Sequence, residues 1–179
     1  MKLDHEHILQ LKELGVRLVD QHSAKILIPA NKEETGYWFG GGNIIQEKNG
    51  RILICGRYRN AGDSTTGTGA GERGLEFAVF AGYEIGDGFD KIISYSKKDL
   101  AHSSDIVSIE GGCLLQNKLT NQTELYISTE KKIAYPKTFI NFQKPRTGVW
   151  SIDQLSGESP ESINLNTIQT VVSSDTPNS

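Results

Sequence analysis

The chain has 179 residues, the size of one domain, and a chain of this length buries roughly two-thirds of the surface that it exposes when unfolded. Its formal net charge of −3 at pH 7 provides no broad basic field for a phosphate backbone, which argues against general nucleic-acid binding. No long apolar stretch follows the N-terminus, so the sequence predicts neither a secretory signal nor a membrane span. We therefore expect a cytoplasmic protein.

Residues His5 to Leu14 carry apolar side chains at helical spacing, and Gly15 follows where a helix C-cap is expected. One short amphipathic helix therefore opens the chain. Behind it the pattern changes to short β-type runs, each bounded by turn residues. The predicted strands are Val16–Val19, Lys25–Ile28, Asn43–Gln46, Ile52–Cys55, Glu76–Phe80, Lys91–Tyr95, Glu124–Ser128 and Val149–Ile152.

The connections between these runs indicate antiparallel pairing. Asn49-Gly50 lies between two apolar runs, as in a β-hairpin. No long helices alternate with the predicted strands, which argues against a parallel α/β fold. The two cysteines, Cys55 and Cys113, form no C-x-x-C pair and lie in apolar runs, so both are predicted to be small buried residues.

The sequence contains one internal repeat. The segment 41–48 resembles the segment 111–118 at an offset of 70 residues, and each copy begins with two glycines before an apolar run. If each copy is one four-stranded blade, the blades bury their faces against one another around a central channel. The sequence thus predicts an all-β fold, with residues 1–172 as blades of an incomplete β-propeller and residues 173–179 as a polar tail.

Glu110 is the first candidate functional residue. It precedes Gly111 and Gly112 at the start of a predicted strand, where an inner strand exposes its side chain to the channel and glycines let a ligand approach closely. The alternative is a carboxylate that caps a loop or pairs with a surface lysine.

The string Ile109-Glu110-Gly111, leading to Glu124–Ser128, resembles the Glu-Gly segment of five-bladed propeller glycosidases such as glycoside hydrolase family 43. That resemblance implies that Glu110 acts as a general acid. It also implies an aspartate as general base on the first blade, but the position that matches Glu110 in the earlier repeat is Gly40. In the family a proline commonly follows the Glu-Gly pair, whereas this chain has Gly112.

The long connection from Arg57 to Glu76 is the second candidate. It carries several charged side chains beside an aromatic ring, a combination that suits a hydroxylated or anionic ligand. The alternative is a solvated insertion whose arginines and carboxylates pair with one another. The resemblance supports arginines of the strand end in substrate binding, and Asp63 is the first candidate for the missing second carboxylate. The candidate binding residues are Arg57, Arg59, Arg73, Glu76 and Trp38, the last as a stacking platform for a sugar ring.

Other chemistries are not predicted. The four histidines are scattered, which argues against a metal site. The glycine-rich segment 67–74 is not followed by the Gly-Lys-Ser/Thr of a phosphate-binding loop, and no cofactor is expected.

The leading hypothesis is therefore a glycoside hydrolase-like propeller that acts on a carbohydrate. The alternatives are a noncatalytic carbohydrate-binding or scaffold propeller and a glycoside phosphorylase that holds phosphate with its arginines.

Overall fold

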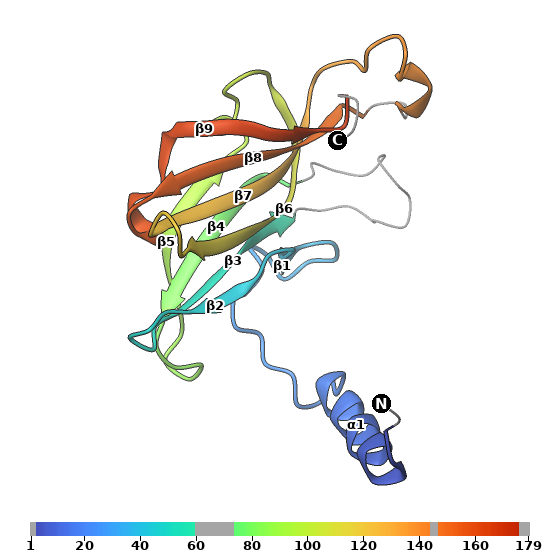
Figure 1. Cartoon of the computed structure of the whole chain (residues 1–179), viewed down its shortest axis with the longest axis vertical. Coiled ribbons are helices and arrows are strands. Elements are labelled where there is room, and N and C mark those ends of the chain that lie inside the picture. Colours follow the sequence, from blue (N-terminus) through green and yellow to red (C-terminus); the bar gives the residue numbers. More distant parts are fainter. Residues whose placement is uncertain (1–2, 60–73, 144–146, 176–179) are drawn as a thin grey trace.

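The computed structural model describes residues 3–59, 74–143 and 147–175. Within these ranges the chain forms one α-helix followed by two antiparallel sheets that lie side by side (Figure 1). The helix α1 (His5–Leu18) has no buried residue and lies apart from the sheets. None of the described helices is long and apolar enough to cross a membrane.

The first sheet has the order β1-β3-β4-β5, and β2 also pairs with β3. β1 pairs with the last residues of β3 and β2 with its first residues, so these two short strands together form one interrupted edge. The bounds are β1 (Trp38–Gly40), β2 (Ile44–Gln46), β3 (Ile52–Arg59), β4 (Glu76–Gly82) and β5 (Asp90–Ser96).

The second sheet has the order β6-β7-β8-β9, in which every strand pairs antiparallel with the next. The two copies of the repeat occupy equivalent places, because Ile44 pairs with Ile54 and Leu114 with Leu125, each joining a first strand to a second. The prediction of four-stranded antiparallel blades is confirmed. The bounds are β6 (Ile106–Asn117), β7 (Gln122–Lys131), β8 (Val149–Gly157) and β9 (Asn164–Ser173), with 3₁₀ turns η2 (Ile140–Phe142) and η3 (Pro160–Ser162).

The main hydrophobic core lies between the two sheets. Alternate residues of β3 and β4 point toward the second sheet, as the period of two in a strand requires. Each large aliphatic or aromatic side chain buried in this way contributes about 1.5–3 kcal/mol to folding. The most completely buried members are Leu53, Phe77, Val79, Leu100, Ile109, Leu114, Leu125, Ile127 and Leu155.

A smaller core covers the opposite face of the first sheet. Its buried members are Ile28, Ile54, Tyr58, Ala78 and Phe80, and Leu27 packs against them. The prediction of a strand at Lys25–Ile28 is wrong, because this segment has no strand pairing and covers the sheet with side chains instead.

The N-terminal helix is longer than predicted. The Asp4 side chain caps it by accepting a hydrogen bond from the His7 backbone N–H at 2.9 Å. Arg17 donates to Glu13 at 2.7 Å, one helical turn earlier, and the helix ends only at Leu18. Gly15 therefore lies inside the helix, and the predictions of a C-cap at Gly15 and of a strand at Val16–Val19 are wrong.

A buried charged network holds the middle of the second sheet together. Asp153 is fully buried and accepts hydrogen bonds from Lys131 Nζ at 2.8 Å, Thr129 Oγ1 at 2.8 Å and Thr170 Oγ1 at 2.7 Å. Burial alone raises the pKa of the Asp153 carboxyl, but the hydrogen bonds from Lys131, Thr170 and Thr129 outweigh burial, and the pKa is lowered. Three strands, β7, β8 and β9, thus share one carboxylate.

We expect Asp153→Asn to lower the free energy of unfolding by about 3–5 kcal/mol, because it leaves the Lys131 ammonium buried without its counter-charge. Urea denaturation at pH 7 measures the change. Asp105→Asn is the matched control: Asp105 and Lys132 are 4.0 Å apart and exposed, so we expect a change within about 0.5 kcal/mol. Equal effects of the two variants would show that burial of the network contributes nothing.

The same network predicts a pH dependence. Because folding lowers the pKa of Asp153, its stabilising contribution is present above the ordinary value of 3.8 and is lost as the pH falls through the lower pKa of the folded protein. The stability difference between the native chain and Asp153→Asn should therefore shrink below pH 3.8, and urea denaturation across this range measures it. A difference that stays constant would contradict the assigned contacts.

Candidate functional site

Glu110 lies at a β-bulge in the first strand of the second sheet. The pairing of β6 with β7 shifts register between Ile106 and Ser108 and again between Ile109 and Gly111. Val107 and Glu110 are therefore the extra residues of two successive bulges. Bulges re-aim side chains and are common beside active sites, so the local backbone turns the Glu110 side chain out of the regular alternation.

The carboxylate of Glu110 contacts an arginine of the neighbouring sheet. Arg57 Nη2 lies 3.2 Å from Glu110 Oε2, and Arg57 Nη1 donates to the Ile109 carbonyl at 3.2 Å. Ser108 Oγ donates to Glu110 Oε1 at 2.5 Å. The side chains of Arg57 and Glu110 are only 12% and 19% exposed, so the pair is less screened than a surface ion pair and joins β3 to β6.

Trp38 completes a three-residue cluster with this ion pair, which we call the Trp-Arg-Glu site (Trp38, Arg57, Glu110). The Arg57 guanidinium lies 5.1 Å from the centroid of the Trp38 ring, a cation–π distance. Trp38 is 36% exposed. The cluster thus presents an exposed aromatic surface, a cation and a carboxylate to the same region.

Gly40 explains how the indole fits. A Cβ atom at residue 40 would lie 2.8 Å from the Trp38 ring, closer than side chains approach one another. The ring therefore occupies the space that a side chain at position 40 would need. The family resemblance implies a carboxylate near this place, and the chain has an aromatic ring there instead.

The two sheets meet at the glycine pairs of the repeat. The Gly112 N–H donates to the Gly41 carbonyl at 2.9 Å, and Gly41 has a φ of +73°, a conformation that favours glycine. A Cβ atom at Gly111 would lie 2.6 Å from the Gly41 carbonyl oxygen. Only backbone fits between the first strands, and this contact places Glu110 within reach of Arg57.

The Asn43 side chain extends the same contact. Its amide donates to the Leu114 carbonyl at 2.9 Å and its oxygen accepts from the Leu114 N–H at 2.8 Å, as a peptide group does in a sheet. The Cys55 thiol also donates to Asn43 Oδ1 at 3.0 Å, and burial raises the pKa of this thiol. Cys55 is buried as predicted. The prediction that Cys113 is buried is wrong, because neighbouring Leu114 points into the core and alternation directs Cys113 outward.

Two other predicted site residues, Arg59 and Glu76, lie on opposite faces of the first sheet. Arg59 follows Arg57 by two positions and shares its face of β3. Glu76 lies on β4 opposite Tyr58, on the other face, where it accepts hydrogen bonds from Lys91 Nζ at 2.6 Å and Ser94 Oγ at 2.8 Å. Asp63 and Arg73 lie outside the described residues.

Ser108 and Asn43 are members of the site region that the sequence did not predict. The equivalence of the two Gly-Gly segments is the signal that could have found Asn43, since it follows the first pair directly. Nothing in the sequence marks the bulge that brings Ser108 to Glu110. Among the described residues, no group of three His, Cys, Asp or Glu side chains gathers as metal ligands.

Comparison with solved structures identifies the fold. A glycoside hydrolase family 43 β-xylosidase/α-arabinofuranosidase from a compost microbial metagenome, solved with xylotriose in a calcium-free form, superposes with a TM-score of 0.51 at 9% identity, over 82% of this chain and 38% of that chain. The chain has the fold of part of a family 43 propeller. A family 43 enzyme from Xanthomonas citri, solved with xylose, gives a TM-score of 0.47 at 12% identity, over 75% of this chain and 32% of that one.

This chain therefore spans about a third of the length of these two enzymes. No family model matches the sequence. No curated protein matches it either.

Because Gly111 contacts the Gly41 carbonyl closely, adding one methyl group at Gly111 should destabilise the protein. Gly111→Ala should lower the free energy of unfolding by about 1–3 kcal/mol, because its Cβ would press on the Gly41 carbonyl and the backbone would have to move. Gly15→Ala is the matched control: nothing lies within 4 Å of that position, and alanine in a helix stabilises by about 0.5–1 kcal/mol. Thermal unfolding of both variants measures the difference. A stable Gly111→Ala protein would contradict the close contact.

Proposed function

We propose that this chain is part of a glycoside hydrolase-like propeller that acts on a carbohydrate, and that the Trp-Arg-Glu site contacts the sugar. The single observation that carries the proposal is the ion pair between Arg57 and Glu110 at a bulge, beside the partly exposed Trp38 ring. Aromatic rings stack on the apolar faces of sugars, while guanidinium and carboxylate groups bind their hydroxyls. The propeller fold is consistent with this assignment.

In the hydrolytic form of the proposal, Glu110 donates a proton to the leaving oxygen of a glycosidic bond. Hydrolysis also needs a second carboxylate, at about 5–5.5 Å in retaining enzymes and about 6.5–9.5 Å in inverting enzymes. We propose Asp63 for that role, because it follows Arg59, near the end of β3, by only four positions in the sequence. Arg57 and Arg59 would then hold substrate hydroxyls.

A noncatalytic form of the proposal is favoured by two specific observations. The Trp38 ring fills the space at Gly40, where the family resemblance implies a carboxylate. In addition, both oxygens of Glu110 already contact protein groups, one the Ser108 hydroxyl and one the Arg57 guanidinium. In this form the site binds a sugar without cleaving it.

Binding is measured by the fluorescence of Trp38 in a Trp150→Phe background, which leaves Trp38 as the single tryptophan of the chain. Xylotriose, which the compost xylosidase structure contains, is the first probe. We expect it to change the Trp38 emission, and we expect Arg57→Met and Glu110→Gln each to weaken binding by about tenfold, since each removes a charge-assisted contact. Glu84→Gln, which changes an exposed glutamate of a distant loop, should bind as the parent does.

Release of the aryl group from a panel of aryl glycosides separates the two forms. If Glu110 is the general acid, Glu110→Gln should slow release by about 10²–10⁴-fold. If the site only binds, the native chain releases no more than the buffer does, while the fluorescence response remains. No response of Trp38 to any sugar of the panel, or equal binding by Glu110→Gln and the parent, would contradict the proposal itself.

A further inference from the structure

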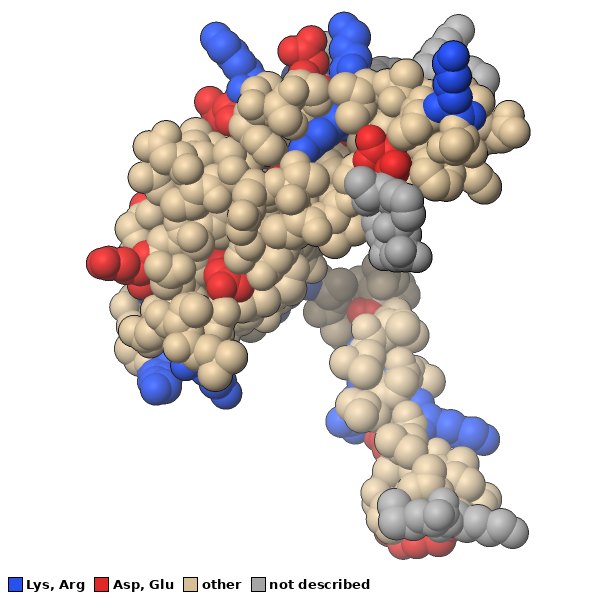
Figure 2. Space-filling model, turned by 45° about the horizontal axis from the view of Figure 1, so that its top comes forward, with Lys and Arg blue, Asp and Glu red and all other residues tan. Residues whose placement is uncertain are grey.

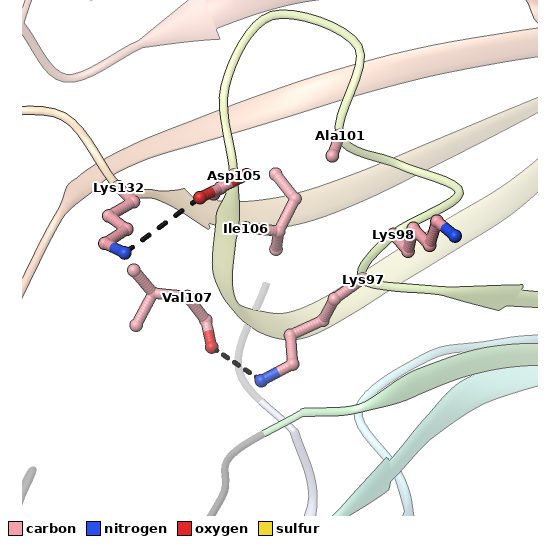
Figure 3. Close-up of a pocket in the computed structure, with 7 residues that line it drawn as sticks. All are labelled: Lys97, Lys98, Ala101, Asp105, Ile106, Val107 and Lys132. Carbon is pink, nitrogen blue, oxygen red and sulfur yellow. Dashed lines mark hydrogen bonds and ion pairs between the residues drawn. The ribbon is translucent and has the colours of Figure 1, made fainter.

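A separate cavity lies at the same end of the second sheet as Glu110. It has a volume of about 460 Å³ and is lined by residues of the β5–β6 connection, the start of β6 and the residue after β7 (Figure 3). This volume falls within the range of small-molecule sites. We call it the lysine cavity; its lining residues are Lys97, Lys98, Ala101, Asp105, Ile106, Val107 and Lys132. No member of the Trp-Arg-Glu site lines it.

The lysine cavity is positively charged in a chain whose formal net charge is negative. Three lysines and one aspartate line it. On the face shown in Figure 2, both basic and acidic side chains lie near the upper edge. Lys97 is partly buried, and its Nζ donates to the Val107 carbonyl at 3.0 Å, which holds it against the wall. A local excess of ammonium groups attracts an anion without the extended basic surface that nucleic acid needs.

Asp105 provides only a weak counter-charge to Lys132. Lys132 Nζ and Asp105 Oδ2 are 4.0 Å apart, and their side chains are 74% and 80% exposed. An exposed pair at this distance contributes little free energy. Lys132 can therefore turn toward a carboxylate in the cavity at low cost, and Figure 3 shows it on the opposite side of Val107 from Lys97.

The rest of the wall is apolar and continues into a second cavity. Ala101, Ile106 and Val107 supply methyl groups, which suit the C–H face of a sugar ring better than a fully hydrated inorganic ion. A neighbouring cavity, also of about 460 Å³, shares Val107 and Lys132 with the first. It adds Gln143 and Thr147, which carry hydrogen-bonding groups. The two cavities therefore adjoin at Val107 and Lys132.

Strand β6 contributes residues to both the lysine cavity and the Trp-Arg-Glu site. Val107 and Glu110 are the two bulged residues of β6, three positions apart, and Val107 lines both cavities. Strand β6 thus carries both a wall residue of the lysine cavity, Val107, and a member of the Trp-Arg-Glu site, Glu110.

We propose that the lysine cavity binds the carboxylate of an acidic sugar, so that the carbohydrate recognised by this protein carries a uronic acid unit. This inference rests on the proposed function, because it assumes that the protein recognises a carbohydrate. Binding of an acidic sugar in the lysine cavity is tested separately. The ammonium groups of Lys97 and Lys132 bind the carboxylate, and the apolar wall contacts the ring.

The test uses the full chain labelled with ¹⁵N and follows its backbone amide resonances during titration with sodium D-glucuronate. D-Glucose is the matched neutral sugar, because it differs only at the carboxylate carbon, and sodium acetate supplies the carboxylate without the ring. We expect glucuronate to shift the amides of residues 97–107 and of Lys132. Glucose, which lacks the charge-assisted contact, and acetate, which lacks the contact of the ring with the apolar wall, should each bind there at least about tenfold more weakly.

Two variants and a control locate the charge. Lys97→Gln and Lys132→Gln should each weaken glucuronate binding by about tenfold. Lys118→Gln, which removes the same charge from an exposed residue beyond the other end of β6, should bind glucuronate as the native chain does. If Lys97→Gln does not fold, the exposed Lys132 still provides the test.

The outcomes separate this inference from the proposed function. Equal binding of glucose and glucuronate, equal binding of acetate and glucuronate, or no shift in residues 97–107 would each overturn the acidic-sugar site. The indole N–H resonance of Trp38 reports on the Trp-Arg-Glu site in the same spectra. Glucuronate could shift the resonances of the lysine cavity while no sugar shifts the Trp38 resonance. That result would support the acidic-sugar site and contradict only the proposed function.

Discussion

The structure depends on a contact in which glycine backbone meets glycine backbone. Gly41 and Gly112 share a hydrogen bond between the first strands of the two sheets, and the Asn43 side chain extends it by pairing with Leu114 as a peptide group would. Any side chain at Gly111 would separate the strands. Because the strands come this close, the core residues of both sheets interdigitate, and Arg57 of one sheet reaches Glu110 of the other.

That proximity has a chemical consequence. Arg57 is placed on the inward face of β3 by alternation, and Glu110 is turned toward it by a bulge that interrupts the alternation of β6. The stacked Trp38 ring occupies the space that Gly40 leaves open. Gly40 leaves room for the Trp38 ring, and Gly111 leaves room for the Gly41 carbonyl. These two glycines therefore allow three residues from different strands to form one site.

The sequence predicted much of the fold and part of the site, for identifiable reasons. Turn residues, strand alternation and the repeat at an offset of 70 residues are local signals, and they indicated antiparallel blades and singled out Glu110 and Arg57 as candidate site residues. The strand predicted at Val16–Val19 was wrong because the helix cap at Asp4 and the Glu13–Arg17 pair sustain a helix through β-branched residues. β9, with its many polar residues, lacks the apolar pattern that marks a strand, and it forms because β8 offers it a partner. The bulge at Glu110, the contact with Ser108 and the lysine cavity arise from tertiary packing, which no local pattern reports.

The most direct test of the central claim is a crystal structure of the protein with xylotriose bound. The account predicts one sugar ring stacked on Trp38, with hydroxyl groups hydrogen-bonded to Arg57 and Glu110. A sugar bound elsewhere on the chain, with the ion pair between Arg57 and Glu110 out of its reach, would contradict the assignment of the site.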